Sequence, residues 1–169
     1  GRPERHVDTR GPRPETRPAS ALVPRSLTAR APARVDFGGG WTDVPPYCDE
    51  RGGVVCNLAI ARYARVRLAE RAGRGDAGDE GAGEMALARA ALTRGELGDV
   101  AMTIASEFPV GAGLGGSSAA GVAAVGATAA WRGERRPDRA LLAQESRRLE
   151  VDDLGVAGGW QDHYAAAFG

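Results

Sequence analysis

The chain has 169 residues, of which 43% are hydrophobic and 26% are charged, and its formal net charge is zero. This length and composition fit a globular domain with a sizeable core, and the balanced charge gives no bulk attraction to nucleic acid or to an anionic membrane. No stretch reaches the roughly 20 apolar residues of a membrane span, and the N-terminus lacks the apolar core of a secretory signal, so we expect a cytoplasmic protein without nucleic-acid or membrane partners.

The N-terminal segment, residues 1–25, is rich in arginine and proline and poor in apolar side chains. Such a segment buries too little surface to offset its chain entropy, so we expect a disordered leader. An arginine-rich arm that binds a partner is the alternative interpretation. We expect the ordered domain to span residues 27–169.

The first part of that domain is predicted to be β-rich. Residues 30–37 suit a strand, and the glycines at 38–40 force a turn after it. Residues 54–60 are typical of a short buried strand, while 63–68 alternate between apolar and polar side chains as a half-exposed strand does. The two cysteines belong to no CxxC pair and lie near no histidine cluster, so we expect reduced thiols rather than a zinc site.

The second part is predicted to be mainly helical. A mobile glycine-rich loop at 72–83 is expected to precede good helix formers at 84–92 and an alternating strand at 99–106. Helices are predicted at 117–131 and at 138–151, where a proline and an aspartate are placed to start the second one. The chain stops directly after the apolar run 164–168, from which we expect a truncated longer protein.

The strongest local signal is the sequence PVGAGLGGSSAA at 109–120, between the last expected strand and a helix. Glycine-rich backbone can approach phosphate oxygens closely and point N–H groups at them, and the helix dipole adds attraction for an anion. Ser117 and Ser118 are expected to cap the helix, or to turn toward phosphate or Mg²⁺. The loop lacks the GK[ST] ending of a Walker A motif, and no acidic residue follows a strand about 20 residues later as in a dinucleotide fingerprint. The alternative to a phosphate-binding loop is an ordinary flexible turn.

This loop resembles the phosphate-binding motif of the GHMP kinases, which include galactokinase, homoserine kinase, mevalonate kinase, L-fucokinase and the bacterial heptose-7-phosphate kinases. An extra glycine before the two serines is similar to the form found in the heptose and fucose kinases. The resemblance implies an ATP site formed by Pro109, Gly111, Gly113, Leu114, Gly115, Gly116, Ser117 and Ser118.

An earlier segment, APARVDFGGGWTDVPPYC at 31–48, resembles the sugar-binding motif of the same family and is closer to its L-fucokinase form. Carboxylates accept strong hydrogen bonds from sugar hydroxyls, so Asp43 is expected to bind the sugar. Trp41 is expected to offer a flat face to the apolar side of the ring. An Asx-turn residue is the alternative for Asp43, and core packing is the alternative for Trp41.

A third segment, GVAGGWQDHY at 155–164, resembles the family segment whose aspartate is the proposed catalytic base. The resemblance implies that Asp162 is this base and that Gly159 lies beside the sugar. It also implies that Arg34 keeps Asp162 ionised, because a neighbouring arginine lowers the pKa of a carboxylate. His163 stands where the family often has glutamine, and we expect it to be structural rather than catalytic.

A Mg²⁺ site is implied as well. The family often places a metal-binding glutamate before the base segment, and Glu150 occupies that place at the end of a predicted helix. Together with Ser117 and phosphate oxygens, it would offer the oxygen ligands that Mg²⁺ prefers. Asp152 and Asp153 are competing candidates, and a solvated helix end is the plain alternative.

Taken together, the three motifs imply the α+β fold of the GHMP kinase N-terminal domain, which is ribosomal protein S5 domain 2-like. The family's C-terminal ferredoxin-like domain is expected to be absent from this chain and to be supplied in cis or in trans. The implied reaction is ATP-dependent phosphorylation of an L-fucose-like sugar at its anomeric hydroxyl, with the isolated half inactive. The alternatives are a heptose 7-phosphate kinase, a non-catalytic nucleotide- or sugar-binding remnant, and a dinucleotide-binding module.

Overall fold

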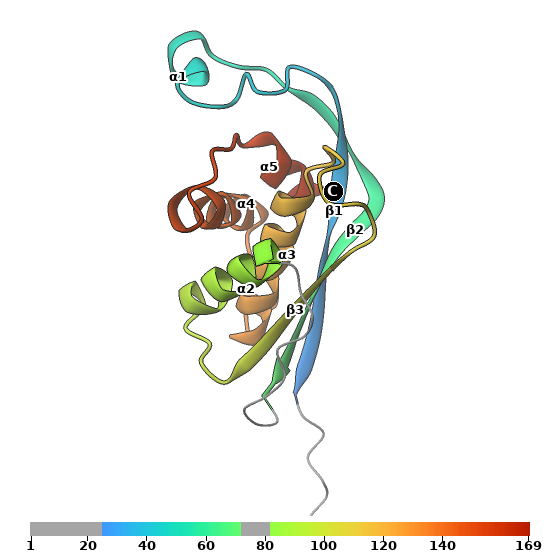
Figure 1. Cartoon of the computed structure of the whole chain (residues 1–169), viewed down its shortest axis with the longest axis vertical. Coiled ribbons are helices and arrows are strands. Elements are labelled where there is room, and N and C mark those ends of the chain that lie inside the picture. Colours follow the sequence, from blue (N-terminus) through green and yellow to red (C-terminus); the bar gives the residue numbers. More distant parts are fainter. Residues whose placement is uncertain (1–24, 72–81) are drawn as a thin grey trace, which may run out of the picture.

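The computed structural model describes residues 25–71 and 82–169, and all structural statements concern these two ranges (Figure 1). The leader predicted at 1–25 lies outside the described residues except for Arg25. The loop predicted at 72–83 also lies outside them except for its last two residues, which begin a helix rather than end a loop.

A three-stranded antiparallel sheet forms one layer of the domain. It contains β1 (Ser26–Gly38), β2 (Cys56–Glu70) and β3 (Val100–Ser106), in the order β1-β2-β3. The prediction of two strands at 54–60 and 63–68 is wrong, because residues 56–60 and 63–68 belong to the single strand β2 and residues 54–55 precede it. The pairing shifts register between Pro32 and Ala33, so two residues of β2 bulge out and the strand continues.

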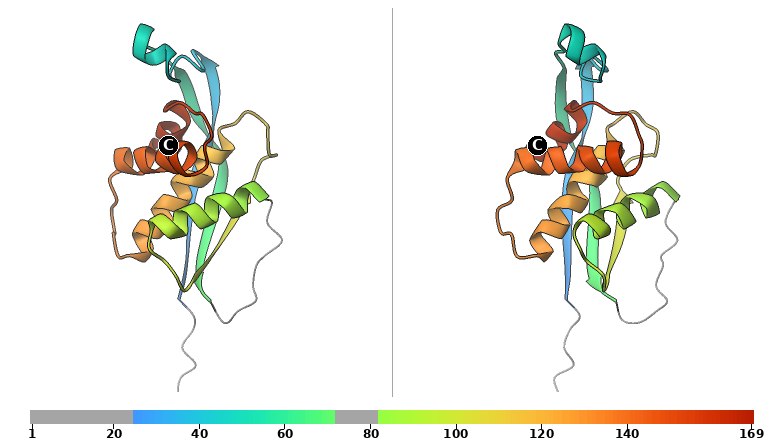
Figure 2. Two further views of the ribbon diagram at one scale, coloured as in Figure 1. Left: turned by 60° about the vertical axis from the view of Figure 1, so that its left-hand side comes forward. Right: turned by 90° about the vertical axis from the view of Figure 1, so that its left-hand side faces the viewer.

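Helices cover one face of this sheet, as Figures 1 and 2 show. The longer ones are α2 (Ala82–Arg94), α3 (Gly116–Trp131), α4 (Arg139–Arg148) and α5 (Gln161–Phe168). The alternation predicted for β2 is confirmed, since Ala64, Val66 and Leu68 are completely buried in the core between the sheet and the helices. Many of the buried residues of α3 are alanines, whose small side chains let the helix lie close to the strands.

The ends of two helices differ from expectation in ways that matter for the site. The predicted helix at 138–151 ends as α4 at Arg148 and continues as a π-helical turn, η1 (Leu149–Asp153). Its start is confirmed, because the Asp138 side chain accepts a hydrogen bond from the Leu141 N–H at 2.9 Å. The prediction that serines cap α3 is wrong, since the cap residue is Gly115 in a left-handed conformation with φ 68° and no side chain caps the helix.

The connection between β1 and β2 projects beyond the helical layer (Figure 2) and carries a short helix, α1 (Tyr47–Arg51), that the sequence did not predict. The turn expected at the three glycines is confirmed. Gly39 has φ 82°, and a Cβ atom there would lie 1.9 Å from the Val54 carbonyl oxygen. The two arms of the connection therefore cross in backbone contact, which fixes the position of the residues between them.

Within the described ranges, no helix has the length and apolar character needed to cross a bilayer.

Candidate active site

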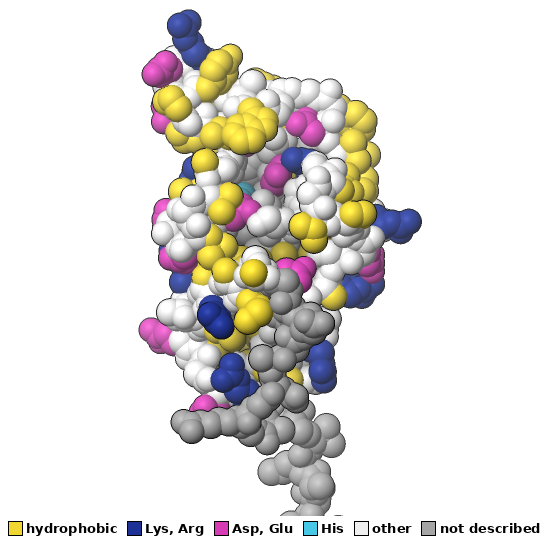
Figure 3. All heavy atoms as spheres, viewed as in Figure 1, with side chains coloured by type: hydrophobic (Ala, Val, Ile, Leu, Met, Phe, Trp, Pro, Cys, Tyr) yellow, Lys and Arg dark blue, Asp and Glu magenta, His cyan; other side chains and the backbone are white. Residues whose placement is uncertain are grey.

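A cavity of about 710 Å³ is lined by residues of β1 and the β1–β2 connection, by the start of α2, by the loop before α3 and the start of α3, and by residues of η1, of the segment that leads into α5 and of the start of α5. Figure 3 shows the hollow, with charged side chains inside it and hydrophobic ones around it. The cavity brings together every site residue that the sequence predicted, namely Arg34, Trp41, Asp43, Pro109, Gly111, Gly113, Leu114, Gly115, Gly116, Ser117, Ser118, Glu150, Gly159 and Asp162.

The glycine-rich loop is anchored by Arg34. The Arg34 backbone N–H donates to the Leu114 carbonyl at 3.0 Å, and its Nη1 donates to the Gly113 carbonyl at 2.6 Å. Because C=O and N–H point in opposite directions across a trans peptide, the N–H groups of Leu114 and Gly115 point away from Arg34. Arg34 thus holds the carbonyls on one side of the loop and turns these donors toward the other side.

The start of α3 adds further donors to the same wall. The first four N–H groups of an α-helix have no partner within the helix, and here they belong to residues 115–118. In this loop Gly111, Gly113 and Gly115 all have positive φ angles, a backbone form that produces anion-binding concavities of successive N–H groups. The loop and the helix start therefore form one continuous surface suited to an anion such as a polyphosphate.

Asp162 lies in the first turn of α5 and faces this loop. Its Oδ1 accepts a hydrogen bond from Arg34 Nε at 2.7 Å and forms an ion pair with Arg34 Nη2, also at 2.7 Å. Its Oδ2 lies toward Gly115, where an added Cβ atom would be 3.3 Å away. One carboxylate oxygen is thus held by Arg34, while the other faces the anion-binding loop, which is the arrangement a general base needs.

Asp43 lies in the segment between β1 and β2 and is hydrogen-bonded to the start of α5. Its Oδ2 accepts hydrogen bonds from the backbone N–H groups of Trp160 at 2.6 Å and Gln161 at 2.8 Å. Its Oδ1 is buried and has no hydrogen-bond partner among the described residues. These contacts replace the Asx turn that was the alternative, and they leave one buried acceptor for a ligand hydroxyl.

Two further predicted sugar contacts flank this carboxylate. Gly159 has no room for a side chain, because a Cβ atom would lie 2.1 Å from Oδ2 of Asp43. Trp41 has a φ angle of 70° and a residue exposure of 72%, and it lines the cavity. Core packing, the alternative for Trp41, is therefore wrong, and its ring is accessible from the cavity side.

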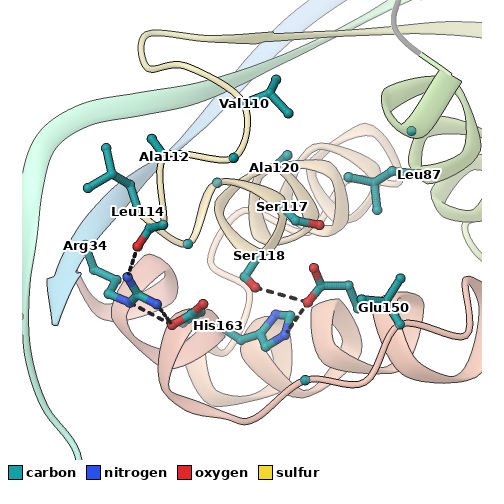
Figure 4. A pocket seen from close by; sticks show the side chains of 18 of the residues that line it. Arg34, Leu87, Val110, Ala112, Leu114, Ser117, Ser118, Ala120, Glu150 and His163 are labelled. Atoms are coloured by element: carbon teal, nitrogen blue, oxygen red, sulfur yellow. Dashed lines mark hydrogen bonds and ion pairs between the residues drawn. The ribbon is translucent and has the colours of Figure 1, made fainter. Parts of the chain in front are cut away.

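Glu150, in the π-helical turn, lies on the far side of the cavity from Arg34 (Figure 4). Its Oε2 accepts from Ser118 Oγ at 3.1 Å and contacts His163 Nε2 at 2.9 Å. Burial raises the pKa of Glu150, but hydrogen bonds from His163, Ser117 and Ser118 outweigh that effect and hold the pKa below its ordinary value. A carboxylate that stays ionised here would suit a cation.

The competing carboxylates are not part of the cavity. Asp152 and Asp153 both pair with Arg94 of α2, the second through two hydrogen bonds. Glu150 and the hydroxyls of Ser117 and Ser118 form a set of oxygen donors that fits Mg²⁺. The described residues include no group of three or more His, Cys, Asp or Glu side chains that could hold a metal ion by itself, so this set would need phosphate oxygens to complete a Mg²⁺ shell.

The lowered pKa of Glu150 leads to a prediction on acid stability. A carboxylate with a lowered pKa stabilises the fold above its unfolded-state pKa of 4.5, and this stabilisation is lost as pH falls through the folded-state pKa. Urea unfolding of wild type and Glu150→Gln is expected to show a larger free energy of unfolding for wild type above pH 5. The difference should shrink as the pH falls to 3, and a constant difference across this range would contradict the prediction.

The sequence analysis did not identify Ser146 or Gly121, which lie behind the cavity. Ser146 of α4 is 1% exposed and contacts His163 Nδ1 at 2.9 Å. It fits against α3 only because residue 121 is glycine, where a Cβ atom would lie 2.4 Å from Ser146 Oγ. A glycine inside an otherwise helical pattern often marks such close packing. Gly121 is therefore the sequence signal that could have indicated the contact between α3 and α4.

Comparisons with known proteins identify the family of the chain. The family model of the GHMP kinases N terminal domain matches residues 82–169. A D-glycero-alpha-D-manno-heptose 7-phosphate kinase of Campylobacter jejuni is 29% identical over 172 residues, which cover 86% of this chain and 49% of that protein. An L-fucokinase/L-fucose-1-P guanylyltransferase of Bacteroides fragilis is 61% identical over 31 residues, which cover 18% of this chain and 3% of that protein.

Solved structures agree in fold. A D-glycero-D-manno-heptose 1-phosphate kinase from Bacteroides thetaiotaomicron superposes with a TM-score of 0.72 at 28% identity, over 86% of this chain and 54% of that one. A Lactococcus lactis galactokinase complexed with galactose superposes with a TM-score of 0.62 at 19% identity, over 85% of this chain and 42% of that one, which supports the fold alone. The chain spans about half the length of the heptose kinase relatives that it matches.

Proposed function

Because the chain belongs to the GHMP kinase family, whose N-terminal domain it matches over residues 82–169, we propose that it forms the ATP- and sugar-binding part of a sugar kinase. One observation carries the proposal: the Asp162 carboxylate faces the glycine-rich anion loop in the same cavity as the unpartnered oxygen of Asp43. A base, a phosphate-binding surface and a hydroxyl acceptor are the parts that phosphoryl transfer to a sugar requires.

In the proposed reaction, the loop at 109–115 and the start of α3 bind the phosphates of ATP through backbone N–H groups. Asp43 orients the sugar by accepting a hydroxyl hydrogen bond at Oδ1, and the exposed ring of Trp41 packs on its apolar side. Asp162 accepts the proton of the attacking hydroxyl at Oδ2. Arg34 holds Asp162 in place through Oδ1 and adds positive charge near the reacting groups. Positioning and charge stabilisation then supply most of the rate.

The fit of the oxygen donors supports Mg²⁺ as the cofactor. Ser117, Ser118 and Glu150 would hold it beside the phosphates. When bound, Mg²⁺ neutralises charge that develops on the phosphate oxygens during transfer. We propose that the 169-residue chain binds ATP and sugar but needs the family's C-terminal ferredoxin-like domain, in cis or in trans, for turnover.

A neutral, L-fucose-like sugar is the proposed substrate, with a phosphate added at its anomeric hydroxyl. Among the described residues that line the cavity, Arg34 is the one arginine, and its guanidinium is engaged by Asp162 and Gly113. Arginine and lysine form the strong charge-assisted hydrogen bonds that commonly bind a phosphate group, and the described lining of this cavity offers no second arginine for a phosphate carried by the sugar. The short stretch that is 61% identical to a fucokinase adds support.

A heptose 7-phosphate is the second candidate substrate. It is favoured by the match to the Campylobacter kinase, because that match covers 86% of this chain whereas the fucokinase match covers 18%. The two candidates differ in the charge of the sugar, so they are separable by binding.

Isothermal titration of the chain with ATP and Mg²⁺, then with sugars, tests the proposal. We expect micromolar binding of Mg²⁺–ATP, competition by ADP, and binding of L-fucose in preference to heptose 7-phosphate. The reverse sugar preference would establish the second candidate. If ATP does not bind, the chain is better interpreted as a non-catalytic remnant. Binding of NAD without competition by ADP would indicate a dinucleotide-binding module.

A further inference from the structure

A chain of buried hydrogen bonds runs behind the proposed Mg²⁺ ligands. It passes from Ser146 Oγ to His163 Nδ1 at 2.9 Å and from His163 Nε2 to Glu150 Oε2 at 2.9 Å, where Ser118 Oγ also donates at 3.1 Å. Figure 4 shows the ring of His163 directed at the Glu150 carboxylate. His163 is 1% exposed, and neither proton abstraction nor phosphate binding assigns it a role.

The contacts on the two ring nitrogens determine which of them carries the proton. A carboxylate is only an acceptor when ionised, so His163 Nε2 must donate to Glu150. In a ring with one proton, Nδ1 is then an acceptor, and the Ser146 hydroxyl must donate to it. Ser146 Oγ could also donate to the Ser118 carbonyl at 3.4 Å, but a hydroxyl has only one proton to donate and the ring nitrogen is the nearer acceptor at 2.9 Å.

The packing around this chain leaves the ring little freedom. Ser146 belongs to α4, His163 to α5, and Gly121 of α3 accommodates the serine because it lacks a Cβ atom. The three helices therefore meet at the imidazole. Glu150 itself lies in the η1 turn, and its carboxylate is held by side chains from two other helices, His163 of α5 and Ser118 of α3.

We propose that His163 is a positioning residue: locked by Ser146, it holds the Glu150 carboxylate against Ser117 and Ser118 in the orientation that binds Mg²⁺ beside the nucleotide phosphates. This inference rests on the proposed function. It assigns His163 a specific role in the cation site, whereas the sequence indicated only a structural residue. Residues that orient metal ligands in this way typically change metal affinity by about 10- to 100-fold when replaced.

Three variants separate positioning from simple packing. His163→Gln keeps an amide donor for Glu150 and an acceptor for Ser146. His163→Leu fills the space without hydrogen bonds. Ser146→Ala removes only the hydrogen bond to His163 Nδ1. Titration of each with ATP in the presence and absence of Mg²⁺ gives the contribution of the cation to binding. Urea unfolding reports whether each variant folds.

The expected result is a loss of at least about tenfold in Mg²⁺–ATP affinity for His163→Leu, with Mg²⁺-free ATP affinity unchanged. His163→Gln should stay within about threefold of wild type, and Ser146→Ala should lie between the two. Equal affinities for Mg²⁺–ATP in wild type and His163→Leu, or equal losses with and without Mg²⁺, would overturn the inference. If His163→Leu does not fold, a Ser146→Ala variant that folds and binds Mg²⁺–ATP as wild type does would overturn it equally.

A second readout does not depend on nucleotide binding. Nitrogen-15 NMR of the His163 ring distinguishes a proton on Nε2 from one on Nδ1. A proton on Nε2 in wild type supports the inference, and a ring protonated on Nδ1 alone contradicts it. Absence of ATP binding by the wild-type chain would refute the proposed function, whereas normal wild-type binding with the wrong tautomer would refute only the role of His163.

Discussion

Replacement of Asp162 by asparagine is expected to lower turnover by about 10²- to 10⁴-fold in the kinase assembled with its C-terminal domain, in cis or in trans, while ATP affinity stays near the wild-type value. Asparagine has the same shape, and its side-chain oxygen can still accept from Arg34, so the contact at Oδ1 is preserved. It cannot take a proton from an attacking hydroxyl at pH 7. The loss should therefore appear in kcat and not in the binding of either substrate.

Asp138→Asn is the matched control for that variant. Asp138 also lies at the start of a helix, where it caps α4, and asparagine caps a helix about as well as aspartate does. We expect its turnover to equal that of wild type, measured as initial rates at saturating ATP and sugar. A rate above a tenth of wild type for Asp162→Asn would show that this carboxylate is not the base.

The second large effect is expected for Gly159→Ala. The added Cβ atom would lie 2.1 to 2.7 Å from the three carboxyl atoms of Asp43, so Asp43 must leave the N–H groups of Trp160 and Gln161. Loss of these hydrogen bonds would free the start of α5, which carries Asp162. Misplacement of catalytic groups by about 1 Å can lower rates by about 10²-fold, and we expect a loss of that size in kcat/KM for the sugar.

The neighbouring glycine supplies the control. A Cβ atom at Gly158 would meet its nearest atom, Oε2 of Glu150, at 3.8 Å, which is an ordinary contact. Neither glycine has a left-handed backbone, so alanine strains the backbone at neither position, and both substitutions restrict the unfolded chain in the same way. Steady-state kinetics should show Gly158→Ala within about threefold of wild type. Equal losses for the two variants would mean that the contact between Gly159 and Asp43 does not position the site.

Much of the site could be predicted from sequence because its residues lie in short segments with unusual composition. The glycines between 111 and 116 indicated an anion loop without reference to any other part of the chain, since the chemistry lies in the backbone of one segment. The pairing of Arg34 with Asp162, which are 128 positions apart, came instead from the family resemblance. Local pattern alone gives no means of joining positions so far apart.

The wrong predictions have local physical reasons. The two strands predicted at 54–60 and 63–68 are one, because a bulge opposite Pro32 and Ala33 absorbs the break in alternation. Serine capping of α3 was expected from residue type, but the left-handed Gly115 begins the helix one residue earlier and places both serines within its first turn. The hydrogen bonds from Asp43 to the start of α5 join segments far apart in sequence, and no local pattern indicated them. The hydrogen bonds from Ser146 to Glu150 depend on how the helices pack, and Gly121 was their one sequence signal.

The most direct test of the account is a crystal structure of the chain with Mg²⁺, a non-hydrolysable ATP analogue and the sugar that binds best. We predict that the phosphates accept hydrogen bonds from backbone N–H groups between Leu114 and Ser118, and that a sugar hydroxyl lies within about 3.2 Å of Asp162 Oδ2. Phosphates bound away from this loop, or a sugar whose hydroxyls are all out of reach of Asp162, would contradict the assignment of this cavity as a kinase active site.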